Sequence, residues 1–169
     1  MYNIHMRTFH VILFITFLCS GVWADDSLKE SDFSPEIIQL DSLPSIGDSF
    51  PLDTEDSTKI TFYLMTSPSQ TSPAIFINVD GIDYILCVDH HDSVCQISVG
   101  DTSFVTPEGV KIDMPYYEAA GYASQTTSCS AGWGWVMPLP SGWNAAFCVG
   151  KSCTDHFPDS THPVGWIFR

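Results

Sequence analysis

The pair Asp80-Gly81, which lies between two apolar runs, constrains the fold of this chain more than any other feature. The runs at residues 74–79 and 82–88 are rich in β-branched and aromatic side chains. An Asp-Gly pair readily supplies the two positive φ angles of a type I′ turn, which joins two strands through a two-residue loop. The sequence therefore predicts a β-hairpin, and a third apolar run at residues 94–99 extends it to a three-stranded meander.

The hairpin also determines which side chains share a face. It pairs three sets of residues across the two strands: Val79 with Ile82, Ile77 with Tyr84 and Ile75 with Leu86. Successive side chains of a strand point to opposite faces, so we expect these six to form one apolar face. A five-residue loop at residues 89–93 then places Val88 opposite Val94 and Cys87 opposite Cys95.

The cysteine spacing predicts disulfide bonds. Directly opposed residues in a sheet are close enough for a disulfide, so we predict that Cys87 bonds to Cys95. Cys148 can then pair with Cys129 or with Cys153, and we favour Cys129. The remaining thiol is either buried or joins two chains, so we expect a monomer or a weak or disulfide-linked dimer.

The first 24 residues have the pattern of a secretory signal peptide. Arg7 precedes an apolar run at residues 9–18 that is too short to span a bilayer, and Ala24 is a small residue suited to a cleavage site. We therefore expect a secreted, extracellular protein. An oxidising compartment of this kind also favours the disulfides.

The charge of the chain limits the classes of partner. It has 20 acidic residues against six Lys and Arg, which gives a net charge of −14. Nucleic acids and anionic membranes need the opposite sign, so neither is an expected partner, whereas a basic protein would be attracted.

Much of the acidity lies in residues 25–58, which we predict to be a largely disordered arm because hydrophobicity there is low. The alternative is that Ile37, Ile38 and Leu40 form a helical turn or dock onto the domain. The candidate binding carboxylates of the arm are Asp48, Asp53, Glu55 and Asp56.

Residues 59–169 are predicted to form a single disulfide-stabilised β domain. Short apolar runs alternate with turns rich in Gly and Pro, and no long helical period occurs. This pattern is typical of an all-β antiparallel sandwich, with a jelly-roll or a flattened barrel as alternatives.

Three tryptophans, Trp133, Trp135 and Trp143, are the strongest candidates for an aromatic binding surface. Three tyrosines between residues 116 and 122 lie nearby in the sequence. Exposed aromatic rings bind sugars and proteins, whereas buried rings belong to a sandwich core. The tryptophans therefore predict either core packing or a small lectin-like module that binds a glycan.

Signatures of catalysis are missing from the sequence. It has no nucleophile elbow, no zinc-protease helix and no phosphate-binding loop. The group Asp89-His90-His91-Asp92 contains metal-binding residue types, but adjacent side chains usually point apart, so a solvated turn is the better interpretation. We expect no cofactor and no metal, and a secreted hydrolase with unidentified carboxylates is only a third alternative.

The main functional prediction is a secreted, non-enzymatic protein that captures a basic extracellular protein. In its signal peptide, acidic arm, all-β pattern and few cysteines, the chain is similar to secreted decoy domains of large DNA viruses and parasites. That resemblance implies an immunomodulator-like role with a chemokine- or cytokine-type ligand. It transfers no residue roles.

Overall fold

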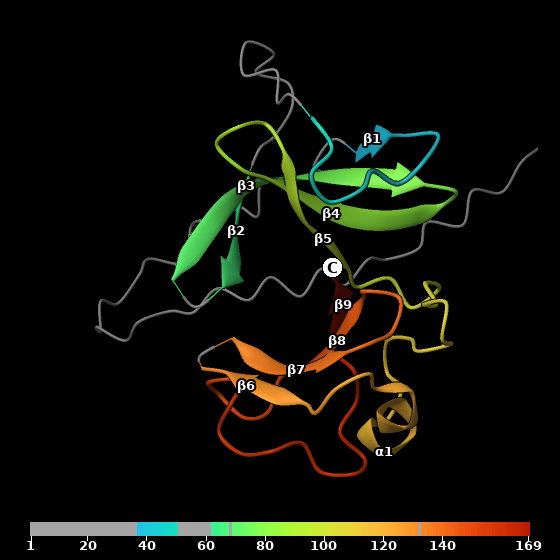
Figure 1. Cartoon of the computed structure of the whole chain (residues 1–169), viewed down its shortest axis with the longest axis vertical. Helices are drawn as coiled ribbons and strands as arrows, with labels where there is room; N and C mark the ends of the chain where they lie inside the picture. The colour runs from blue at the N-terminus through green and yellow to red at the C-terminus, as the bar shows by residue number, and fades with distance from the viewer. Residues whose placement is uncertain (1–36, 51–61, 68, 132) are drawn as a thin grey trace, which may run out of the picture. The chain divides into compact units, whose positions relative to one another are not determined.

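The predicted hairpin lies within a nine-stranded mixed sheet in the computed structural model (Figure 1). The structure describes residues 37–50, 62–67, 69–131 and 133–169. The predicted signal peptide therefore lies outside the described residues, as do residues 25–36 and 51–58 of the predicted arm.

The strands are short, as the frequent turns indicate. Their bounds are β1 Ile37–Gln39, β2 Phe62–Ser67, β3 Gln70–Val79, β4 Ile82–Val88, β5 Val94–Val99, β6 Ser128–Ser130, β7 Gly134–Pro138, β8 Asn144–Phe147 and β9 Trp166–Phe168. One helical turn, α1 at Tyr116–Ala119, continues into a 3-10 turn, η1 at Ala120–Tyr122. The all-β prediction is confirmed.

The strands belong to one hydrogen-bonded sheet rather than to two. Its order is β1-β3-β4-β5-β9-β8-β7-β6, and β2 pairs with the other half of the same β3 edge as β1. The pairing of β5 with β9 connects strands β1–β5 to strands β6–β9. In this pairing Ser98 lies opposite Phe168 and Val99 opposite Ile167. Every strand pair is antiparallel except β1 with β3, which is parallel.

The hairpin register is confirmed in full. Asp80 and Gly81 have φ angles of 52° and 82°, as a type I′ turn requires. All three predicted pairs are formed, and all six side chains belong to the hydrophobic core or pack against it. Turn chemistry and side-chain alternation were therefore sufficient to place these two strands.

The predicted Cys87–Cys95 disulfide is absent, because the β4–β5 pair contains a bulge. Val88 lies opposite Val94 as expected, but the register then shifts and Cys87 lies opposite Gln96. The extra residue is Cys95, so the two cysteines are not directly opposed. Both are free thiols in this structure.

The Cys129–Cys148 disulfide is also wrong, since Cys148 bonds to Cys153. Cys129 in β6 lies opposite Trp135 in β7, which lies opposite Phe147 in β8. Cys148 follows Phe147, so it is two strand spacings, about 10 Å, from Cys129. That distance exceeds the Cα separation that a disulfide spans, whereas the turn after β8 brings Cys153 next to Cys148.

We expect alkylation of the native protein to distinguish the three free thiols. Cys129 is exposed, whereas Cys87 has no exposed surface, and burial followed by the neighbouring Cys95 thiol raises the pKa of Cys87 to about 12. Iodoacetamide should label Cys129 first and Cys87 only after denaturation, because thiolate is the reactive form. Peptide mapping measures this, and a Cys129–Cys148 cross-link in non-reduced protein would contradict the structure.

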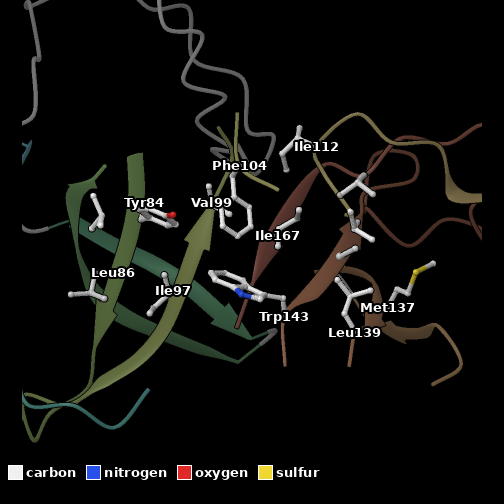
Figure 2. Close-up of a cluster of buried hydrophobic side chains, with 14 of the residues drawn as sticks. Tyr84, Leu86, Ile97, Val99, Phe104, Ile112, Met137, Leu139, Trp143 and Ile167 are labelled. Carbon is white, nitrogen blue, oxygen red and sulfur yellow. The ribbon is translucent and has the colours of Figure 1, made fainter. Parts of the chain in front are cut away.

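The core is built from one face of the sheet and the loops that pack on it. Figure 2 shows Trp143 and Phe104 among side chains of β4, β5 and β9. The Trp143 ring lies 4.9 Å from the Phe104 ring, and the Arg169 guanidinium lies 4.8 Å from its centroid. These contacts come from three distant parts of the chain, so Trp143 joins them.

Residues 37–50 of the predicted arm are part of this fold. β1 pairs with β3 through Ile37, Ile38 and Gln39, and the Leu40 amide donates to the Asn78 carbonyl at 2.9 Å. Half-buried apolar side chains from this segment pack against the core: Ile38, Leu40, Leu43 and Phe50. The prediction of disorder is therefore wrong for residues 37–50, and the docking alternative describes them.

Candidate functional site

The loop after β1 and the β4–β5 loop form one hydrogen-bonded platform. The Gly47 amide donates to the Val94 carbonyl at 2.8 Å, and the Val94 amide donates to the Asp48 carbonyl at 2.9 Å. The Phe50 amide also donates to the Asp92 carbonyl at 2.7 Å. Two loops that are distant in sequence are therefore held side by side as a short antiparallel bridge.

Three carboxylates lie on this platform, which we call the acidic end: Asp48, Asp89 and Asp92. Asp48 and Asp92 are exposed and Asp89 is half-buried. Neither residues 45–50 nor residues 89–93 contain a Lys or Arg. The acidic end therefore presents like charges that no Lys or Arg of its own two loops neutralises.

Backbone amides hold two of these carboxylates in place. Asp89 Oδ1 accepts from the His91 amide at 2.8 Å and the Ser93 amide at 3.1 Å, and these bonds lower the pKa of Asp89. Asp48 Oδ2 accepts from the Ser45 amide at 2.8 Å. The loops thus position the side chains. Because its pKa is lowered, Asp89 stays ionised at a lower pH than an ordinary carboxyl does.

The other predicted arm residues, Asp53, Glu55 and Asp56, lie outside the described residues. They follow Phe50 by only a few positions in the sequence, and Phe50 itself is bonded to the acidic end. Of the four arm carboxylates proposed from sequence, the structure therefore describes Asp48 alone, and it adds Asp89 and Asp92 beside it.

The histidines of the acidic end stack on each other. The His90 and His91 rings lie 3.8 Å apart, and both side chains are exposed. Within the described ranges, no group of three or more His, Cys, Asp or Glu side chains is arranged to hold a metal ion. The two rings therefore belong to the polar surface of the turn.

The three candidate tryptophans do not form one surface. Trp143 is 5% exposed and lies in the core, so it is not a binding residue. Trp135 lies opposite Phe147 on the core side of β7 and contacts the exposed Phe157 ring at 5.0 Å.

Trp133 lies on the other face of the sheet, against Trp166 at 5.7 Å and Phe168 at 4.8 Å. Two residues apart on one strand, Trp133 and Trp135 would share a face, but β7 begins only at Gly134. The Trp133 amide donates to the Ser130 carbonyl at 2.9 Å, so Trp133 belongs to a turn and strand alternation does not apply. The predicted three-tryptophan lectin surface is therefore not formed.

A polar pocket that no sequence motif predicted lies between the η1 turn and the segment that leads to β6. The pocket, which we call the Tyr116 pocket, has a volume of about 370 Å³ and is lined by Tyr116, Ala120, Ala123, Ser124, Gln125, Thr126 and Thr127. Its signal in the sequence is four consecutive residues with hydroxyl or amide side chains, directly after a short helical turn.

In the part of the chain that the structure describes, no helix combines the length and the apolar content needed to cross a membrane. Comparison with known proteins finds no matching family model, no matching curated protein and no matching solved structure.

Proposed function

We propose that this protein is a secreted, non-enzymatic binding protein that captures a basic extracellular protein through its acidic end. The observation that carries the proposal is the platform of Asp48, Asp89 and Asp92. Two bonded loops present these carboxylates, and neither loop contains a Lys or Arg. In the sequence, Asp53, Glu55 and Asp56 follow Phe50 within six positions and carry further negative charge.

Secretion is supported by the leader-like first 24 residues and by the Cys148–Cys153 disulfide. Disulfides persist in oxidising compartments and are rare in the cytosol of most cells. A basic cytokine-sized ligand fits an extracellular acidic protein, because opposite net charges accelerate the encounter of the two proteins.

The charges are expected to act mainly on the rate of association. Each exposed ion pair contributes only about 0–1 kcal/mol, while the combined field of several carboxylates steers a basic partner toward the acidic end. Salt screens this field within about 8–10 Å at physiological ionic strength. Binding that depends on the acidic end should therefore weaken as salt is raised.

Neutralising the acidic end is expected to slow capture of the partner about tenfold to a hundredfold. The variant combines Asp48→Asn, Asp92→Asn, Asp53→Asn, Glu55→Gln and Asp56→Asn, and it leaves Asp89 to hold the turn. The partner is first captured from extracellular fluid on the immobilised protein, and association and dissociation rates are then measured by surface plasmon resonance. The loss should appear mostly in the association rate.

A control variant removes two charges elsewhere, through Asp113→Asn and Glu118→Gln in the segment around α1, and is compared with Asp48→Asn and Asp92→Asn alone. Lysozyme serves as a basic protein without a specific fit, and it should bind far more weakly than the captured partner. The proposal fails if the acidic-end variant associates at the unmodified rate, if salt leaves the rate unchanged, or if the purified protein turns over a substrate.

A further inference from the structure

The Tyr116 pocket is held rigidly at both ends. At one end, the amides of Tyr116 and Tyr117 donate to the carbonyls of His162 and Ser160 at 2.8 and 3.0 Å. At the other end, the amide of Ser124 donates to the Pro138 carbonyl at 2.8 Å. These bonds fix the backbone at both ends of the lining segment, which reduces the ordering cost of binding.

The Tyr116 side chain forms a fixed wall of the pocket. Its ring contacts Phe147 at 5.3 Å and Phe157 at 5.3 Å, both edge to face, and its hydroxyl lies 3.3 Å from Thr127 Oγ1. Only one of these two hydroxyls donates to the other, so the second keeps a proton for a ligand. The buried Thr127 thus holds a hydroxyl pair at the pocket wall.

The chemistry of the lining selects a neutral ligand with many hydroxyls. None of the seven lining residues is charged, so a charged ligand finds no ion-pair partner among them, and the net charge of −14 further disfavours an anion. Ser, Thr and Tyr hydroxyls and the Gln125 carboxamide both donate and accept, which matches a sugar hydroxyl. Two alanine methyl groups provide apolar contact for the C–H face of a sugar ring.

The volume and the neighbouring aromatic ring support the same ligand. The pocket is open to solvent, and its volume of about 370 Å³ is suited to a single ring rather than a large apolar molecule. Phe157, which contacts Tyr116, is 48% exposed and provides an apolar face beside the pocket for a second ring. We propose that the Tyr116 pocket is a binding site for a neutral saccharide, separate from the acidic end.

The test is a titration of the full-length secreted protein, labelled with ¹⁵N, with methyl glycosides of galactose, mannose and N-acetylglucosamine. Glucuronate and sialic acid are the anionic comparators. We expect at least one neutral glycoside to shift the amide signals of residues 123–127 and the Gln125 side chain, while the anionic sugars do not. Gln125→Ala and Tyr116→Phe should each weaken this binding about 2- to 10-fold, which corresponds to one lost hydrogen bond.

Matched controls separate binding from folding. Tyr116→Phe keeps the ring that packs on Phe147, and Ser128→Ala removes a hydroxyl just outside the pocket and should leave the affinity unchanged. A thermal unfolding curve checks that each variant is folded. The proposal is overturned if no neutral glycoside shifts residues 123–127 at millimolar concentration, if only anionic sugars bind, or if both pocket variants bind like the unmodified protein. None of these outcomes depends on capture of a basic protein.

Discussion

Replacing Trp143 with alanine is expected to lower the free energy of unfolding by about 3–5 kcal/mol. The side chain is 5% exposed, and it packs on Phe104 and beneath the Arg169 guanidinium. Its removal leaves a cavity where loop, sheet and C-terminal residues meet, and these elements cannot all move in to fill it. Chemical denaturation followed by circular dichroism measures the loss.

Trp133→Ala is the matched control, because it removes the same side chain from a half-buried position on the other face. Trp133→Ala should lower the free energy of unfolding clearly less than Trp143→Ala does. Trp143→Phe should retain much of the stability, since an aromatic ring still fills part of the space. Equal losses for Trp133→Ala and Trp143→Ala would contradict the placement of Trp143 in the core.

Removing the apolar contacts of the 37–50 segment is expected to lower the free energy of unfolding by about 2–4 kcal/mol. The variant combines Ile38→Ala, Leu40→Ala and Phe50→Ala, whose half-buried side chains pack against the core. Each contributes roughly half of what full burial would give. The measurement is the unfolding midpoint and its slope in urea.

The control is Ile37→Ala in the same strand, which removes a side chain that is 40% exposed. This substitution should lower the free energy of unfolding by less than about 1 kcal/mol. A triple variant as stable as the unmodified protein would show that residues 37–50 are dispensable and would restore the interpretation of an independent arm.

The part of the fold that the sequence predicted is the part that local rules determine. Asp80-Gly81 fixes a two-residue turn, and alternation then assigns Ile77 and Tyr84 to the core face. The bulge at Cys95 was not predictable in this way, because one inserted residue changes the pairing without a distinctive residue type. The parallel pairing of β1 was missed because its apolar residues lie in a carboxylate-rich context that resembles a disordered segment.

For the candidate site too, the sequence predicted the local features but not the long-range contacts. The sequence shows that Asp48 is acidic and that residues 89–93 form a polar turn, but their proximity comes from the long-range bridge between Ser49 and Ser93. The tryptophans could not be assigned to core or surface from spacing, since Trp143 lies in a loop that turns inward and Trp133 in a turn before its strand. Burial is decided by tertiary packing, which residue type alone does not reveal.

The pairing of β5 with β9 has a consequence for the way this sheet assembles. The β3–β4–β5 meander closes short loops, so it can form early and locally. The β5–β9 ladder joins segments far apart along the chain. Two hydrogen bonds between the backbones of Ile97 and Arg169, 2.9 and 3.0 Å long, extend it. The entropy of closing that long loop is lost before its contacts form, so we expect this pairing to form late in folding. Until it forms, the edge of β5 is open to strands of other chains, and a mutation that delays the join should favour aggregation over folding.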